Sequence, residues 1–159
     1  MEVEFDIQMT SADLYDYMLH HTYNSAQGLI GSVAGALMIV AAAAGAGILC
    51  LIAGMIVLLY LPITLFLKSK QQFLMNASFK RPLHFKMTEE GIEVSQGEET
   101  QSQKWEEMHR AVSTMKSIIL YTSPVNASIF PRRELGEKIP GVIEMISTHM
   151  PSSKVKIRC

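Results

Sequence analysis

The sequence has no charged side chain between Thr22 and Leu67, although Asp, Glu, Lys and Arg make up 18% of its 159 residues. A charge at the centre of a bilayer costs about 2.5 to 3.5 kcal/mol on insertion scales, so membrane-spanning segments exclude charge. A soluble domain has no reason to exclude charge over such a length. The absence predicts a segment that lies in lipid.

The apolar part of this segment is too long for a single crossing. As one helix, residues 29–67 would extend about 58 Å at about 1.5 Å per residue, whereas the hydrocarbon core of a bilayer is about 30 Å thick. The Gly45-Ala46-Gly47 tripeptide lies near the middle, and such small, flexible residues suit a tight reversal. The sequence predicts a transmembrane helical hairpin over 23–68, with helices over about 25–44 and 48–67.

The two predicted helices differ in composition. The first is rich in Ala and Gly, which contribute little to insertion, so we expect it to need the second, in which Leu and Ile dominate. Gly31 and Gly35 have the spacing that lets two helices approach closely. The same spacing is common by chance in a span of this composition. Helix packing at these two glycines and a plain alanine-rich span therefore both stay open.

Basic residues are absent from the first part of the chain, because all 14 Lys and Arg follow Leu67. By the positive-inside rule, the chain after the hairpin is cytoplasmic. A hairpin returns both ends to one side, so we expect a multi-pass protein of the cytoplasmic (inner) membrane with both termini in the cytoplasm. The lack of Lys and Arg before Thr22 also argues against a cleavable signal peptide, which needs a basic start.

Residues that build catalytic or metal sites are scarce. Cys50 and Cys159 are the two cysteines, and neither a disulfide framework nor a metal site can be built from them. The five histidines share no ligand spacing, and the sequence contains no phosphate-binding loop, nucleophile motif or dinucleotide fingerprint. We therefore expect no enzyme activity, no cofactor, no metal and no nucleic-acid partner.

Alternating side chains after the hairpin predict a sheet. Leu83, Phe85 and Met87 alternate with polar residues, a period of two that is typical of a strand with one buried face. A turn follows, and the alternation resumes at Ile92 and Val94, which indicates a β-hairpin. Further short strands are expected in a poorly buried run up to Trp105 and over 111–115, 118–122 and 127–130.

Two helices are expected to accompany these strands. Apolar residues at helical spacing from Ile139 to Met150 predict an amphipathic helix that closes the domain. Near the other end of the chain, Thr10 or Ser11 can cap a short helix that leads towards the first span and carries Asp13 near its positive end.

The first residues of the chain also read as a strand, because Val3, Phe5 and Ile7 alternate with polar residues. An isolated strand has no stability of its own, so we expect it to pair with the sheet formed after the hairpin. Residues 1–22 would then belong with residues 69–159 in one cytoplasmic domain that the hairpin interrupts.

Three short motifs resemble landmarks of the YcxB-like family of small bacterial membrane proteins. They are FKMTEEGIEV at 85–94, Trp105-Glu106-Glu107, and Phe130-Pro131-Arg132-Arg133. The resemblance extends over nearly the whole chain and implies a pleckstrin-homology-like (PH-like) domain, a strongly bent antiparallel sheet closed by a C-terminal helix. It implies no established activity. The expected fold class is an α+β membrane protein, with a two-helix transmembrane hairpin inserted after the first strand of a PH-like domain.

Basic residues near the predicted membrane surface are candidates for lipid or partner binding. Lys68, Lys70, Lys80 and Arg81 follow the second span, where each cation beside anionic lipid contributes about 1 kcal/mol. Topology determination alone explains these four, and we favour that interpretation.

Arg132 and Arg133 can bind a phosphate headgroup or an anionic peptide through two parallel hydrogen bonds. We favour the simpler interpretation for Arg133, which is pairing with Glu134 or Glu137 on the surface. Trp105 can bind a partner, but beside a predicted sheet a core position is favoured.

Two classes of function are compatible with these features. The first is a membrane-anchored PH-like interaction module that contacts membrane lipids and binds a protein or lipid partner at the inner face of the membrane. The alternative is a small oligomeric subunit of a transport or channel complex, formed by self-association through the hairpin. Spans without an ionisable residue argue against this alternative.

Overall fold

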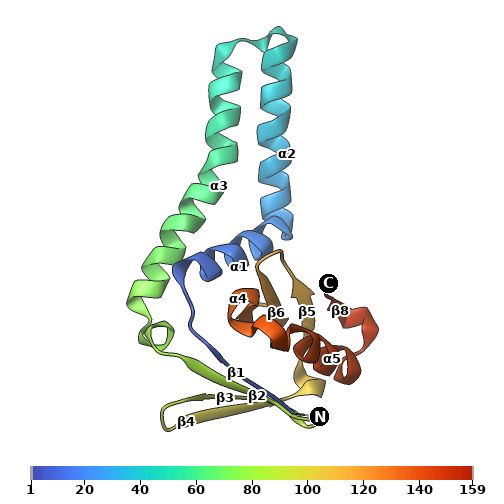
Figure 1. Cartoon of the computed structure of the whole chain (residues 1–159). Coiled ribbons are helices and arrows are strands. Elements are labelled where there is room, and N and C mark those ends of the chain that lie inside the picture. The colour runs from blue at the N-terminus through green and yellow to red at the C-terminus, as the bar shows by residue number, and fades with distance from the viewer. Residues whose placement is uncertain (1, 159) are drawn as a thin grey trace.

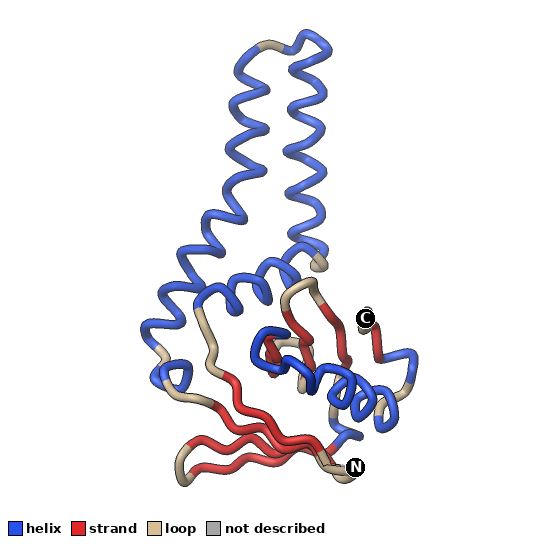
Figure 2. Tube along the Cα trace, viewed as in Figure 1, coloured by secondary structure: helices blue, strands red, loops and turns tan. Residues whose placement is uncertain are grey.

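The computed structural model describes residues 2–158 as an α+β protein with a long helical hairpin and two small sheets (Figures 1 and 2). Its helices are α1 (Ser11–Tyr23), α2 (Ala26–Ala41), α3 (Ile48–Met75), α4 (Arg132–Leu135) and α5 (Ile139–His149). Its strands are β1 (Val3–Ile7), β2 (Leu83–Met87), β3 (Gly91–Gln96), β4 (Glu99–Lys104), β5 (Arg110–Ser113), β6 (Ser117–Tyr121), β7 (Ala127–Pro131) and β8 (Val155–Lys156).

The hairpin formed by α2 and α3 stands away from the rest of the protein (Figure 1). The chain reverses between the two helices, where Gly45 and Gly47 have φ of 102° and 93°, a region that favours glycine. The helical segments Ala26–Ala46 and Ile48–Met75 are both long and apolar enough to cross a membrane. Their large apolar side chains point outward, as at Leu37 (62% exposed) and Leu49 (78% exposed).

Small residues bring α2 and α3 into close contact. A Cβ atom on Gly35 would lie 2.7 Å from Cγ of Leu58, and one on Gly54 would lie 2.9 Å from the carbonyl oxygen of Gly35. Gly31 is less crowded, because a Cβ there would be 3.8 Å from Leu61, an ordinary contact. The helices thus approach most closely at Gly35 and Gly54.

Helix α3 runs beyond the predicted end of the second span. It continues past Leu67 to Met75 because its last turns pack against the protein, with Ser69 fully buried and Phe73 against the core. A helix of 28 residues is about 42 Å long, more than the roughly 30 Å of a hydrocarbon core. The predicted domain boundary at residue 68 therefore falls inside one continuous helix.

The first sheet has the strand order β1-β2-β3-β4, and all of its pairs are antiparallel. The predicted pairing of the N-terminal strand is observed, with Val3 opposite Met87 and Ile7 opposite Leu83. Segments on either side of the hairpin are thus joined by backbone hydrogen bonds. The β4 strand is almost entirely exposed, in line with the poorly buried run expected from the sequence.

The second sheet has the order β7-β6-β5-β8 and was not expected as a separate sheet. Its first three strands are antiparallel, whereas β8 pairs with β5 in parallel. Strand β8 was not predicted, because its two residues are too few to show an alternation. The described chain thus forms two four-stranded sheets.

Both sheets share one hydrophobic core with α5. Phe5 stacks on Phe85 with ring centroids 5.6 Å apart, and Phe130 from the second sheet meets the two rings edge-on at 5.4 and 5.0 Å. The predicted closing helix is present, and it buries Val142, Met145 and Ile146 against this core. For convenience, residues 2–23 and 77–158 are called the sheet domain.

Helix α1 is the part of the sheet domain that lies across the base of the hairpin, between the hairpin and the strands (Figure 1). It begins with a capping box, in which Thr10 and Asp13 satisfy each other's backbone N–H groups. Tyr17 packs against a small cluster on the second sheet formed by Val112, Ile119 and Tyr121. This helix therefore connects the hairpin to the second sheet.

Candidate functional site: a cleft between the two sheets

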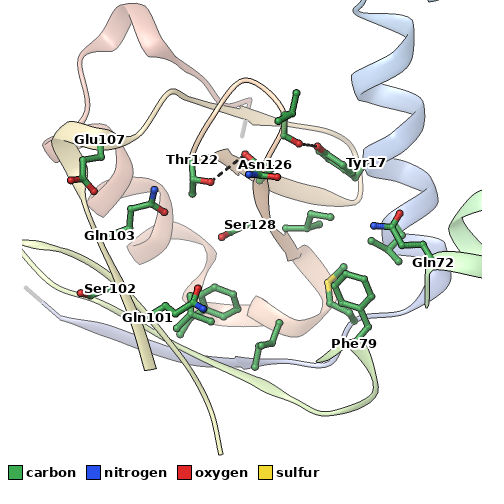
Figure 3. A pocket seen from close by; sticks show the side chains of 18 residues that line it. Tyr17, Gln72, Phe79, Gln101, Ser102, Gln103, Glu107, Thr122, Asn126 and Ser128 are labelled. Atoms are coloured by element: carbon green, nitrogen blue, oxygen red, sulfur yellow. Dashed lines mark hydrogen bonds between the residues drawn. The ribbon is translucent and has the colours of Figure 1, made fainter. Parts of the chain in front are cut away.

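A cleft of about 770 Å³ opens between the two sheets (Figure 3). We call it the inter-sheet cleft. One side is formed by β2, β3 and β4, and the other by β7 and the loop before it, while α1 and the last turns of α3 contribute Tyr17 and Gln72. Its volume lies within the range of about 300 to 1,000 Å³ that is usual for ligand sites.

The floor of the inter-sheet cleft is apolar. Met9, Leu14, Phe85 and Ile129 line it and are buried. Apolar side chains that line a concave surface favour an occupant with apolar side chains of its own.

The rim is polar but nearly uncharged. Figure 3 shows amide and hydroxyl side chains from both sheets around the opening, and Glu107 is the one charged residue among those that line it. The neutral polar residues of the lining are Gln72, Gln101, Ser102, Gln103, Thr122, Asn126 and Ser128. A negatively charged occupant would find no cation here, and a positively charged one would find Glu107 alone.

Two strand edges face the cleft. Residues 101–103 of β4 and 127–129 of β7 line it as consecutive triplets. Neighbouring side chains of a strand point to opposite faces, so a cavity lined by consecutive residues meets the strand at its edge. Both strands are outermost in their sheets, which leaves one side of each backbone unpaired within the described part of the chain.

The backbone of Ser102 points to the free edge of β4. The N–H of Trp105 donates to the carbonyl of Glu90, and antiparallel bonding alternates along a strand. The N–H groups of Gln101 and Gln103 therefore point towards β3, and that of Ser102 points away from it. An extended segment in the cleft would find this donor available.

The cleft is connected to the base of the hairpin. The Tyr17 hydroxyl, on α1, donates to the carbonyl of Val125 at the rim (3.2 Å; Figure 3). Gln72, three residues before the end of α3, lines the same opening. Any occupant would therefore lie beside α1 and the last turns of α3, at the base of the hairpin.

The six basic candidates from the sequence do not form one site. Lys68 and Lys70 lie on α3, where the Lys70 ammonium is 4.5 Å from the ring centroid of Phe66. Lys80 and Arg81 follow that helix, and the Arg81 carbonyl accepts a hydrogen bond from the Gln96 side chain (3.2 Å). None of these four lines the inter-sheet cleft.

Arg133 forms a different ion pair from the one favoured above. Its two terminal nitrogens hold the carboxylate of Asp13, at 2.5 and 2.9 Å, and the Asp13 side chain is only 5% exposed. The predicted pair with Glu134 is present too, at 3.1 Å. Arg133 thus connects α4 to the first turn of α1, a contact that no local pattern in the sequence indicates.

The ion pair changes the pKa of Asp13. Burial alone raises the pKa of a carboxyl group, but the hydrogen bonds from Arg133 and Thr10 outweigh that effect. The pKa of Asp13 is therefore lowered from its usual 3.8, and the charged form is favoured in the folded protein.

Trp105 occupies the core position favoured above. It is 5% exposed, its ring nitrogen donates to the Thr88 carbonyl (2.8 Å), and it stacks on His149 with centroids 5.3 Å apart. Its surroundings leave little of the ring for a partner. Within residues 2–158, no group of three or more His, Cys, Asp or Glu side chains is arranged to hold a metal ion.

The residues of the cleft were not among the candidates found in the sequence. Gln101, Ser102 and Gln103 belong to a stretch that reads as a poorly buried strand, and such a stretch was the only available signal. The cleft forms where the two sheets meet, and neither the alternation of side chains nor the spacing of motifs predicts that arrangement.

The arrangement is that of a small α+β protein with a helical hairpin and a site-poor sheet domain. A model of the YcxB-like protein family matches residues 88–146. The predicted resemblance to this family is thus confirmed over this segment. The matched segment contains the edge strands of the cleft, but neither the hairpin nor β1. No curated protein and no solved structure matched the chain.

Proposed function

We propose that the protein is a membrane-tethered interaction module, whose inter-sheet cleft binds an extended segment of a partner protein at the inner face of the membrane. The tether is the hairpin of α2 and α3, with its outward apolar side chains in lipid. The absence of charge over this segment and its two-helix length both support insertion.

Strand pairing and charge support the orientation. Because β1 precedes the hairpin and pairs with β2 after it, both flanks of the hairpin lie on the same side of any membrane that it crosses. All 14 Lys and Arg residues are in the flank after Leu67, so the positive-inside rule assigns that side to the cytoplasm.

The observation that carries the partner proposal is the pair of unpaired strand edges facing one cleft. Extended peptides bind to such edges by adding a strand, with main-chain hydrogen bonds for affinity and pockets for alternate side chains. The occupant is therefore an extended, uncharged segment, with apolar side chains towards the floor and polar ones towards the amide rim. Two sheets closed by a C-terminal helix are also compatible with the PH-like comparison.

The test uses the full chain in native membranes. A photo-crosslinking residue is placed at Gln101, which lies on the same sheet face as Val94 and Phe85, or at Glu99 as a matched control on the same strand and face but outside the cleft. We expect a defined segment of one protein to be captured from position 101 alone. A synthetic peptide of that segment should then bind the purified full-length protein.

Proline variants show whether this binding uses the strand edge. Ser102→Pro removes the N–H that faces the cleft, whereas Thr100→Pro removes an equivalent N–H outside it, and proline is tolerated on an edge strand. We expect Ser102→Pro to weaken peptide binding about tenfold. The variant loses the hydrogen bond from the Ser102 N–H to the peptide, and the proline ring disturbs the neighbouring main-chain hydrogen bond. Equal crosslinking from both positions, or equal binding by both variants, would overturn the proposal.

A further inference from the structure

A second cavity, of about 720 Å³, lies between the end of α1 and the exposed side of β5 and β8. We call it the basic cavity. Its lining includes Arg110, Arg132, Lys156 and Arg158, together with His20 and Asn24 from the end of α1. No Asp or Glu is among the residues that line it. Four of the 14 Lys and Arg residues thus gather in one hollow.

These four cations have no acidic partner within residues 2–158. Elsewhere in the domain, Arg133 is paired with Asp13 and Glu134, and Lys86 is paired with Glu2 and Glu4 across the first sheet. In the basic cavity, Arg132 donates instead to the carbonyl of Arg158 (2.7 Å), and Arg110 lies over the ring of Tyr121 (4.3 Å). Asp16, on the neighbouring turn of α1, accepts a hydrogen bond from Thr114 (2.6 Å).

Hydrogen-bonding groups without partners concentrate at the same place. Four buried side-chain nitrogen or oxygen atoms in the described residues lack a partner, and three of them, Nε of Arg110, Nε of Arg132 and Nδ1 of His20, belong to residues that line the cavity. Buried polar groups are normally satisfied, and each that is not costs about 1 to 3 kcal/mol. The residues around this cavity are therefore less fully hydrogen-bonded than the rest of the described chain.

The cavity lies beside the start of the hairpin. His20 and Asn24 come just before Ala26, where α2 begins, so the cavity would lie at the surface of a membrane crossed by the hairpin. Met115, in the turn between β5 and β6, is also part of the lining and is 94% exposed. An apolar side chain held at the mouth of a cationic hollow suits the boundary between headgroups and acyl chains.

We propose that the basic cavity is a phosphate-binding site whose ligand is the headgroup of an anionic membrane phospholipid. Guanidinium groups match phosphate in shape and charge, and a charge-assisted hydrogen bond is roughly twice as strong as a neutral one. A phosphate in the cavity would neutralise part of the positive charge and accept hydrogen bonds from the exposed side chains of Lys156 and Arg158. The lipid source depends on the membrane tether proposed above, whereas phosphate recognition depends neither on it nor on the inter-sheet cleft.

The test compares two double variants of the full-length protein in non-ionic detergent. Lys156→Gln with Arg158→Gln removes two exposed cations of the cavity, and Lys80→Gln with Lys104→Gln removes two exposed cations elsewhere. Native mass spectrometry measures how much phosphatidylglycerol and phosphatidylcholine each protein retains from an equal mixture. We expect wild-type protein and the second variant to prefer phosphatidylglycerol, and the first to lose about tenfold of that preference.

Two further measurements identify the source of the phosphate and guard against misfolding. Titration with inorganic phosphate, followed by calorimetry, distinguishes a site for free phosphate from one that needs the lipid. The Met115 side chain is exposed, so Met115→Glu should leave the fold intact. It places a negative charge at the mouth of the basic cavity, and it should therefore reduce the retention of phosphatidylglycerol. Binding of inorganic phosphate with the same dependence on Lys156 and Arg158 would support the site and assign its ligand to solution.

Three outcomes would overturn the inference. They are the absence of binding by both phosphatidylglycerol and inorganic phosphate, an equal loss in the two double variants, and full retention in the Met115→Glu protein. Because none of these variants alters the inter-sheet cleft, failure here is distinguishable from failure of the partner proposal.

Discussion

The hairpin and the sheet domain distribute apolar side chains in opposite ways. In the hairpin, large apolar residues such as Leu49 point outward, and the contact between helices is made at Gly35 and Gly54. In the sheet domain, aromatic residues such as Phe130 are fully enclosed, and few large apolar side chains are exposed. The same hydrophobic effect acts in both regions, and the difference is the one that the proposed insertion of the hairpin into lipid requires.

The largest contrast expected between the two regions is their accessibility across the membrane. In a background with Cys50→Ser and Cys159→Ser, we would introduce Ala46→Cys in the turn of the hairpin or Thr100→Cys in the sheet domain. A membrane-impermeant maleimide should label the Ala46→Cys protein in intact cells and the Thr100→Cys protein only after permeabilisation. Labelling of the Thr100→Cys protein in intact cells would contradict the proposed orientation.

A second contrast lies in the cost of truncating an apolar side chain. Phe130→Ala should lower the free energy of unfolding by about 3 to 5 kcal/mol, because it leaves a cavity among Phe5 and Phe85. Leu49→Ala should change it far less, since that side chain meets lipid or detergent. Urea unfolding in detergent, followed by fluorescence of the single tryptophan, measures both. Similar losses would mean that the outward face of α3 is packed against protein.

A smaller effect is expected at the ion pair that joins α1 to α4. Asp13→Asn should destabilise the sheet domain by about 2 kcal/mol, because it weakens both the helix cap and the bonds to Arg133. Glu144→Gln, an exposed carboxylate on α5, is the matched control and should be near neutral.

The same pair makes stability depend on pH. The folded pKa of Asp13 lies below its unfolded value near 3.8, so the folded state binds fewer protons, and the stabilisation is complete above about pH 4. It is lost as the pH falls through the folded pKa. The gap in unfolding free energy between wild type and Asp13→Asn should therefore narrow below pH 4, and a constant gap would contradict this assignment.

Features that depend on composition or short-range alternation were predictable from the sequence. The charge-free stretch predicted the hairpin, and Val3, Phe5 and Ile7 predicted a strand that pairs with the later sheet. The second helix was predicted to end near Leu67, where the apolar run ends, but α3 continues to Met75. Its last turns are stabilised by the packing of Ser69 and Phe73, which the apolar run does not reveal.

Features that depend on distant parts of the chain were not predictable in this way. Arg133 meets Asp13 across 120 positions, and the cations of the basic cavity come from β5, α4 and the chain end. Arg132 was proposed for phosphate binding from its own motif. Its neighbours Arg110, Lys156 and Arg158 are brought to it by sheet pairing, which no local pattern reveals.

The pairing of β1 with β2 has a consequence for the order of synthesis. Val3 leaves the ribosome early, but its partner Met87 follows only after the whole hairpin has been made. Synthesis proceeds at about 5 to 20 residues per second, so β1 remains unpaired for several seconds. By returning the chain to its starting side, an inserted hairpin reduces the entropy cost of closing this long loop. Correct membrane insertion would then be a kinetic prerequisite for folding of the domain, so that a chain that fails to insert also fails to assemble its first sheet.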